Sequence, residues 1–333
     1  MTSAVQSQPV RTPRLARFAW GVLVYNLAVI AWGAFVRATG SGAGCGRHWP
    51  MCNGEVIPRP KHVETVIEFA HRATSGIALV LVIALFVAVF RTYPKRSSAR
   101  RAAGFSLGFV LSEALVGAGL VLFELVAHDA SMKRALSMAI HLNNTFLLLA
   151  SLAATVYFTS GGERVRWRDQ GLVRAPIGAA LAGMMLLGTS GALAALGDTL
   201  FPARSLAAGL AQDLSVGAHF LIKLRGLHPL FALVTGFVCT TAAVAARRAR
   251  RGDAAIDSVS RVLTGAFLAQ LCLGVANLLL LAPVALQLAH LVLADVVWIA
   301  LVFLGLRVFA ARHAVKVEPA VSPTSDRGTV PLR

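Results

Sequence analysis

Four histidines lie inside long apolar stretches of this 333-residue chain and are the residues best suited to bind a metal. They form repeat-related pairs, because His71 and His228 lie 157 residues apart and His141 and His290 lie 149 apart. Neutral imidazole is a good metal ligand, and apolar surroundings disfavour its charged form. Ionisable groups at membrane depth are costly and usually face a bundle interior where they have a partner. The spacing predicts that these side chains act in pairs.

The helices that carry these histidines would bring them to similar depths. Each histidine falls within about two turns of the same end of its apolar stretch, roughly 8 to 11 Å deep at 1.5 Å per residue. Two histidines that face one another across a four-helix bundle could ligate one haem iron axially, and each half supplies one pair. The alternative is four structural histidines that hydrogen-bond between helices. We favour that alternative for a single histidine but not for four at related positions.

Glu68 lies one helical turn before His71 and shares its helix face. A carboxylate there could relay protons or bind a substrate. The alternative is an ion pair with Arg72 or Lys61. The second half has Arg225 at the matching position, and a guanidinium suits a haem propionate better than catalysis. Arg72 and Arg225 are thus candidate propionate contacts, and the difference predicts chemistry in the first half and a permanent cofactor in the second.

The composition is that of a polytopic membrane protein. The chain is 56% hydrophobic and 14% charged, with a mean hydropathy of +0.69. Its net charge of +17 is spread over short basic tracts between apolar stretches. Because no basic and aromatic residues interleave, the charge does not indicate nucleic acid as a partner.

The sequence predicts an all-α integral membrane protein with eight transmembrane helices, arranged as two pseudo-symmetric four-helix bundles. Both halves keep the same orientation, so they form a tandem parallel repeat about an axis along the membrane normal. The first apolar stretch lacks an early cleavage site and is expected to be a retained helix. The predicted helices are Ala16–Arg37, Thr65–Phe90, Ala102–Leu125, Leu136–Phe158, Val173–Leu196, Leu224–Ala246, Val262–Ala282 and Val284–Phe309.

Lysine and arginine gather in the loops on one side, which predicts that both termini are cytoplasmic. The expected division is an N-terminal tail at 1–14, a first half at 15–160, a cytoplasmic linker at 161–172, a second half at 173–312 and a disordered tail at 313–333. The tail is assigned from its Pro, Ser, Thr and charged residues. Residues 201–223 form a loop whose role the sequence does not indicate.

Cys45 and Cys52 lie in the loop GSGAGCGRHWPMC, on the side that should be oxidising. A disulfide is therefore predicted. Closing so short a loop stabilises by about 2–3 kcal/mol at best, so a redox or loop-shaping role remains open beside a structural one. Cys239 and Cys272 are expected to be packing residues.

Three polar residues inside the helices are expected to hydrogen-bond between helices or to support the histidines. They are Asn143 and Asn144, beside His141, and Asp295, five residues after His290.

The blocks GAFVRATGSGAGCGRHWPMCNGEVIP and IEFAHRATSG resemble bacterial haem A synthase, an eight-helix membrane family related to the mitochondrial enzyme. The resemblance covers about Ala16–Phe309 and includes the cysteine pair Cys45 and Cys52, which is typical of one subgroup. It implies oxidation of the C8 methyl of haem O to a formyl group by successive hydroxylations. The product, haem A, would serve terminal oxidases, and a haem b cofactor would lie beside the substrate.

The same resemblance implies a division of labour. In the first half His71 and His141 would bracket the substrate haem O, and Glu68 would match the family's acidic residue needed for activity. In the second half His228 and His290 would be the axial ligands of haem b.

The expected partners are haem O, the lipid bilayer, an electron donor, haem O synthase and oxidase assembly factors, with a homo-oligomer left open. The expected location is the plasma or inner membrane. A dihaem b-type electron-transfer cytochrome is the main alternative, but it gives no reason for Glu68 opposite Arg225. A haem O carrier and a two-repeat transporter are further alternatives.

Overall fold

The computed structural model describes residues 11–59, 62–166 and 171–310. Most of the two predicted tails, Lys61 and part of the predicted linker lie outside these ranges.

Eight of the helices in the described ranges are long and apolar enough to cross a membrane, which confirms the predicted fold class. Each contains most of one predicted segment. All but α9 extend it at one or both ends, by up to eight residues at the start of α8, and α9 ends one residue earlier than predicted. Apart from two isolated bridges, the described residues contain no β-structure. The long helices are α1 Pro13–Ala38, α2 Val63–Thr92, α3 Ser98–Leu122, α4 Met132–Thr159, α5 Arg174–Leu200, α7 Phe220–Ala249, α8 Ala254–Leu279 and α9 Val284–Val308.

Local sequence signals set several of the helix starts. The Ser97 and Ser131 hydroxyls accept hydrogen bonds from backbone N–H groups three residues later and so cap α3 and α4. Asp253 caps α8 in the same way, with two N–H donors. Pro283 precedes α9 and lies in the short connection between the last two helices.

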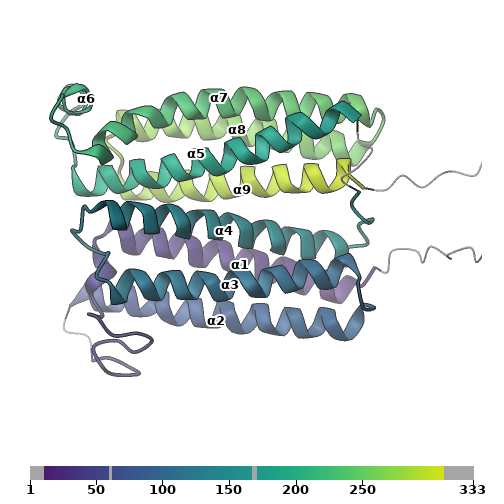
Figure 1. The fold of residues 1–333 in the computed structure, drawn as a ribbon, viewed down its shortest axis with the longest axis horizontal. Helices are drawn as coiled ribbons and strands as arrows, with labels where there is room; N and C mark the ends of the chain where they lie inside the picture. Colours follow the sequence, from purple (N-terminus) through teal and green to yellow (C-terminus); the bar gives the residue numbers. More distant parts are fainter. Residues whose placement is uncertain (1–10, 60–61, 167–170, 311–333) are drawn as a thin grey trace, which may run out of the picture.

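Each half of the chain closes into a ring of four helices. In the first half α1 packs on α2, α2 on α3, α3 on α4 and α4 on α1. In the second half α5, α7, α8 and α9 repeat this cycle in the same order. Figure 1 shows the halves stacked, with α4 and α9 between them. This repeated packing is what a tandem parallel repeat of four-helix bundles requires.

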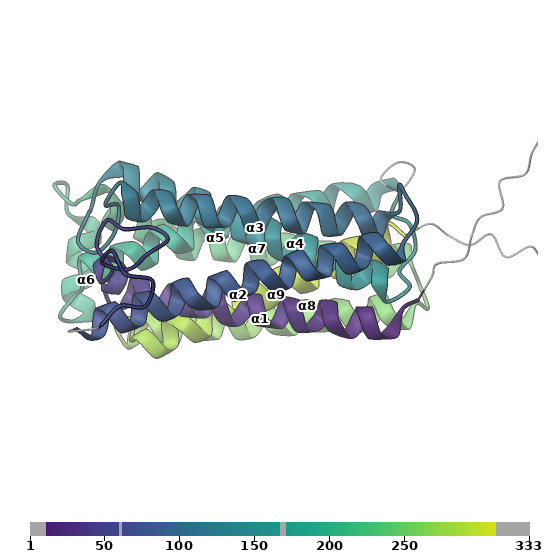
Figure 2. The ribbon, with the colours of Figure 1, turned by 90° about the horizontal axis from the view of Figure 1, so that it is seen from below.

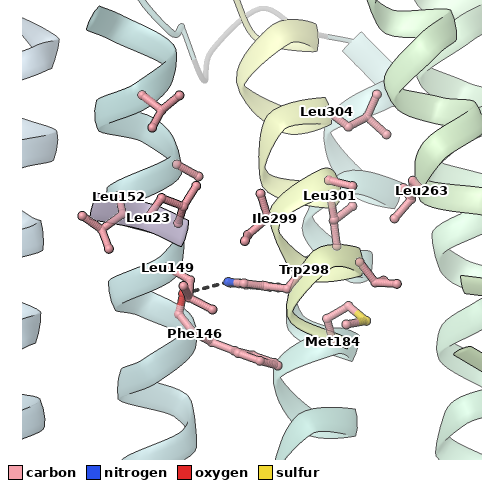
Figure 3. Close-up of a cluster of buried hydrophobic side chains, with 14 of the residues drawn as sticks. Leu23, Phe146, Leu149, Leu152, Met184, Leu263, Trp298, Ile299, Leu301 and Leu304 are labelled. Atoms are coloured by element: carbon pink, nitrogen blue, oxygen red, sulfur yellow. Dashed lines mark hydrogen bonds between the residues drawn. The ribbon is translucent and has the colours of Figure 1, made fainter. Parts of the chain in front are cut away.

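The core between the halves is built on α4 and α9. The Trp298 ring stacks on Phe146 with centroids 4.9 Å apart, and its Nε1 donates a 2.7 Å hydrogen bond to the Phe146 carbonyl (Figure 3). Gly188 on α5 also borders Phe146, because a Cβ there would lie 2.6 Å from the ring. Both halves therefore share one tightly packed core.

The loops divide between the two ends of the bundles. The loop of residues 40–59, called the cysteine loop below, contains the short 3₁₀ helix Ser41–Ala43 and lies at the same end as α6, Leu206–Leu214 (Figure 2). At the opposite end Thr12 N–H donates to the Thr159 carbonyl. A second 3₁₀ helix, Gly171–Val173, precedes α5. The beginning of α1 and the end of α4 thus meet at one end of the molecule.

Candidate functional site

His228 on α7 and His290 on α9 form the better-defined histidine pair. Their ring centroids lie 6.4 Å apart with an interplanar angle of 79°, and both side chains are half-buried. Two imidazoles that bind one metal from opposite sides would have ring centres about 6 Å apart, given metal–nitrogen bonds of about 2 Å. The pair therefore fits the two axial ligands of one haem iron.

Glycines make room for these two rings. A Cβ at Gly191 of α5 would lie 3.1 Å from Cε1 of His228, and a Cβ at Gly274 of α8 would lie 3.2 Å from Cε1 of His290. Ser190 Oγ lies within hydrogen-bond distance of His228 Nδ1, at 2.9 Å. That contact leaves Nε2 of His228 available as a ligand.

His71 on α2 and His141 on α4 form the matching pair in the first half. Both side chains are half-buried. His71 packs against Gly33 of α1, where a Cβ would lie 2.9 Å from Cε1. Gly33 and Gly191 occupy repeat-related positions, so one histidine in each half contacts the same glycine of the repeat.

Glu68 is buried where α2 meets the cysteine loop, with only 3% of its surface exposed. Its Oε2 accepts a 2.7 Å hydrogen bond from the Cys45 N–H. Its Oε1 accepts from Arg72 at 3.1 Å from Nε and 2.5 Å from Nη2. Arg72 Nη1 also donates to the carbonyls of His48 and Met51. Glu68 and Arg72 together hold the cysteine loop on the helix that carries His71.

The cysteine loop packs directly on the first turns of α2. Cys45 and Cys52 form the predicted disulfide. The Gly44 carbonyl accepts a 2.8 Å hydrogen bond from Thr65 Oγ1. A Cβ at Gly44 would lie 2.4 Å from the Glu64 carbonyl, so only glycine permits this approach. The loop therefore covers the end of the first bundle about one helical turn from His71.

Arg225 plays a corresponding part in the second half. It donates to Asp198 of α5 at 3.0 Å and to Asp213 of α6 at 2.6 Å. This ion-pair network holds α6 against the bundle. The segment 201–223, whose role the sequence did not indicate, therefore contains a helix that is anchored to α5 and α7. The donors of Arg72 and Arg225 thus have protein partners, and the expected contacts with haem propionates stay a prediction.

Arg37 joins the halves at the end that carries the cysteine loop, a role that sequence analysis missed. Its Nη1 donates to the Ala195 carbonyl and to Thr199 Oγ1, each at 2.7 Å, and Nη2 donates to Gln287 Oε1 at 2.9 Å. From the sequence, an arginine at the end of an apolar segment is taken for a charged residue of the following loop, because the sequence does not reveal which helix it faces.

Of the three polar residues expected to hydrogen-bond between helices, two do so within the described ranges and one does not. Asn143 donates to Thr189 Oγ1 of α5 at 2.7 Å, and Asn144 donates to the Phe109 carbonyl of α3 at 2.9 Å, so both join helices as expected. Asp295 is fully buried, and neither carboxylate oxygen has a hydrogen-bond partner among the described residues. Of the two thiols predicted to pack, Cys239 is buried and Cys272 is exposed.

The sequence of residues 16–302 matches the family described as cytochrome oxidase assembly protein, COX15-CtaA. The chain belongs to this family. Relatives that resemble it include a heme A synthase from Exiguobacterium sp., 34% identical over 151 residues, which are 45% of this chain and 48% of the relative. Another is a heme A synthase from Bacillus mycoides, 42% identical over 97 residues, or 29% of this chain and 31% of the relative.

A longer relative matches more of the chain. It is named protoheme IX farnesyltransferase, comes from Thermus thermophilus and is 48% identical over 299 residues. These residues make up 89% of this chain but 49% of the relative. The chain spans about half the length of the relatives it matches first. Family membership and eight apolar spans make this COX15-CtaA protein a multi-pass membrane protein.

Proposed function

We propose that this protein is a haem A synthase, an oxidoreductase that converts the C8 methyl of haem O to a formyl group. The observation that supports this most is the unequal surroundings of two repeat-related histidine pairs. His228 and His290 stand 6.4 Å apart with a serine as the polar neighbour of one ring. In the first half Glu113 lies 3.3 Å from His141, and Glu68, one helical turn before His71, holds the disulfide-closed loop. Relatives named heme A synthase support the same reaction.

The second half, residues 173–312, is the proposed haem b site. His228 and His290 would be its axial ligands, which agrees with the spacing of the rings. Gly191 and Gly274 leave space for the rings and would keep them in fixed orientations. A resident cofactor held in this way suits electron transfer, because its ligands need not move during a reaction cycle.

The first half, residues 15–160, is the proposed substrate site, with His71 and His141 on the two sides of haem O. Bound haem supplies the iron centre that hydroxylation of an unactivated methyl group requires. Two hydroxylations followed by loss of one water replace two hydrogens of the methyl by one oxygen, a four-electron oxidation. The balance would be met by dioxygen with two electrons from an external donor at each hydroxylation, or by water with an external acceptor that takes up all four electrons.

Glu68 and the cysteine loop would exclude water and hold protons at this site. Glu68 Oε1 and Oε2 are held by Arg72 and by the Cys45 N–H, so the carboxylate is fixed one turn from His71. A carboxylate placed in this way can accept a proton released during oxidation. The disulfide between Cys45 and Cys52 would keep the loop closed over the site.

The membrane setting follows from the distribution of basic residues. Both termini are proposed to be cytoplasmic and the cysteine loop to face the outside of a plasma or inner membrane. An electron donor, haem O synthase and oxidase assembly factors are the proposed partners. Whether the protein forms a homo-oligomer is decided by measuring its mass in detergent.

Participation in haem O formation is the second candidate, favoured by the relative named protoheme IX farnesyltransferase. That name belongs to a protein about twice as long, of which this chain matches 49%. Because the match leaves about half of that relative uncovered, we do not carry farnesyl transfer over to this chain. Supplying this protein with haem b and farnesyl diphosphate should then yield no haem O. Haem O formed under these conditions would transfer the farnesylation step to this chain.

The deciding experiment is expression in a membrane that supplies haem O, followed by acid-acetone extraction and chromatography of the haems. Haem A together with a hydroxylated intermediate is the expected result. Haem b with unaltered haem O would instead favour the dihaem cytochrome or the carrier. A purified protein with no haem absorbance would favour the transporter.

A further inference from the structure

Glu113 on α3 faces one of the two histidines of the proposed substrate site. Its Oε1 lies 3.3 Å from Nδ1 of His141, and the two side chains are 20% and 27% exposed. Within the described ranges, the charged or chargeable partner of Glu113 is this histidine and not a lysine or arginine. The carboxylate is therefore close enough to accept the ring N–H of His141 after a small rotation of the imidazole, although the two atoms do not yet form a hydrogen bond.

A short network of hydrogen bonds holds the Glu113 carboxylate in place. Thr145 Oγ1 donates to Oε1 at 2.5 Å, and Asn144 Nδ2 donates to Oε2. Ser112 Oγ donates to Asn144 Oδ1 at 2.6 Å, which turns the amide so that its N–H₂ group faces the carboxylate. Because every neighbour donates to it, the carboxylate keeps its remaining acceptor capacity for His141.

The second half lacks this network at every position. The repeat-related residues of Ser112, Glu113, Asn144 and Thr145 are Ala269, Gln270, Leu293 and Ala294. Gln270 donates a 3.0 Å hydrogen bond to the backbone carbonyl of His290 instead. The same bundle thus packs without the acidic network, so packing alone does not require it.

Among the four histidines, only His141 has a carboxylate as neighbour of Nδ1 within the described part of the chain. Nδ1 of His71, of His141 and of His290 completes no hydrogen bond among the described residues, but that of His141 alone has a carboxylate oxygen at 3.3 Å. Nδ1 of His228 has a serine hydroxyl. A carboxylate that accepts the N–H of a metal-binding histidine fixes its tautomer, leaves Nε2 for the metal and raises the basicity of the ligand.

We propose that Glu113 is a positioning residue that makes His141 the most electron-donating of the four histidines. This inference rests on the proposed function, because it needs a haem iron between His71 and His141. A more basic ligand stabilises ferric over ferrous iron, so the carboxylate lowers the reduction potential of the haem in the first half relative to that in the second. Ser112, Asn144 and Thr145 serve by orienting the carboxylate.

The test is a spectroelectrochemical titration of the purified holoprotein loaded with haem O, compared with Glu113→Gln. The component that disappears in His71→Ala identifies the haem of the first half. Glu113→Gln should change its ferric-to-ferrous ratio about tenfold, which is a rise of about 59 mV for a one-electron couple. Its low-spin electron paramagnetic resonance signal should shift too, while the haem of the second half keeps its potential. Glu124→Gln, an exposed glutamate paired with Arg47, is the matched control.

A purely structural Glu113 would give a different result. Haem content and thermal stability would fall, but the haem that remains would keep its potential and its resonance signal, and this outcome overturns the proposal. Should Glu113→Gln lose the haem, Thr145→Val and Ser112→Ala take its place, since both keep the carboxylate but loosen it. They should give smaller rises in potential, and unchanged potentials overturn the proposal. A wild-type protein without haem in its first half would contradict the haem-site assignment itself, and this inference with it.

Discussion

At the scale of single residues, the contacts of Glu68 show how the two roles that the sequence offers for this side chain are related. The sequence offers two roles, a proton-handling carboxylate or a partner of Arg72. The structure places Arg72 and the Cys45 N–H on the same carboxylate. The two roles are therefore compatible, because a fixed and buried carboxylate one helical turn from a proposed haem ligand is better placed for proton transfer than a mobile one.

Glu68→Gln tests that role. The amide keeps the size of the side chain but cannot take up a proton, so haem A yield should fall by about a hundredfold or more. The haem b spectrum of the second half should be unchanged. Glu64→Gln, an exposed glutamate in the first turn of the same helix, is the control and should keep its activity. Normal haem A yield from Glu68→Gln would remove this residue from the mechanism.

The ring-contacting glycines allow each half to be perturbed separately. Gly33→Ala places a methyl 2.9 Å from His71, and Gly191→Ala places one 3.1 Å from His228. The first should weaken haem O binding and turnover, and the second should weaken haem b binding, each roughly tenfold because the ligand ring must shift. Quantitative haem extraction measures both. Gly21→Ala and Gly178→Ala, with no atoms within 4 Å of the new methyl, are controls on the same helices. Equal loss of both haems from either variant would contradict separate sites.

At the scale of elements, a polar clamp holds one loop to the end of each bundle. The Glu68–Arg72 pair holds the cysteine loop, and Arg225 holds α6 through Asp198 and Asp213. The clamps use repeat-related positions, because Arg225 replaces Glu68. The two halves thus place the clamp at the same position of the repeat, but with a carboxylate in the first half and a guanidinium in the second.

Arg225→Gln should release α6 without removing haem b. The amide cannot pair with both aspartates, so trypsin should cleave after Arg204 or Lys223 about tenfold faster, which reports local opening of the segment. Cleavage rates and the haem b spectrum are measured on the same sample. Arg247→Gln, which removes an exposed ion pair with Asp257, is the control for loss of one arginine. An unchanged cleavage rate would show that α6 is held by other contacts.

At the scale of the whole molecule, the two bundles are joined by the α4–α9 core and by Arg37. Trp298 fills this core and donates to the Phe146 carbonyl (Figure 3). Arg37 of α1 donates hydrogen bonds to α5 and α9. Sites in different halves are therefore placed relative to one another by shared packing. A substitution that weakens packing at this interface should therefore lower the stability of both halves together.

Trp298→Phe tests that coupling. The substitution keeps an aromatic ring but removes the indole N–H that the Phe146 carbonyl accepts in addition to its bond within α4, and it leaves a cavity, at a cost of roughly 1–3 kcal/mol. In detergent the Tm should fall by about 2–6 °C, and both haems should be released in the same transition. Trp49→Phe, an exposed tryptophan in the cysteine loop, is the control. Release of the two haems in separate transitions would show that the bundles unfold independently.

The sequence alone determined the fold class, the eight spans and the cysteine pair. These properties are local, since length and apolarity make a membrane helix and a short spacing in a Gly- and Pro-containing loop permits a disulfide. It also selected the four histidines and Glu68 as candidates, because the internal repeat compares each position with a second copy. Helix ends moved by up to eight residues, as capping depends on backbone geometry.

Tertiary structure alone decided which polar groups meet. Glu113 and Gln270 are a repeat-related pair in the sequence, but only the packing of α3 on α4 places the carboxylate 3.3 Å from His141. Arg37 likewise gains its partners across the two halves, and Arg225 gains Asp213 from a helix that the sequence did not predict. The physical reason is that such contacts depend on the rotation of each helix about its axis and on its neighbours. Apolar periodicity is weak on helices that face lipid on one side and protein on the other, so it does not determine this rotation.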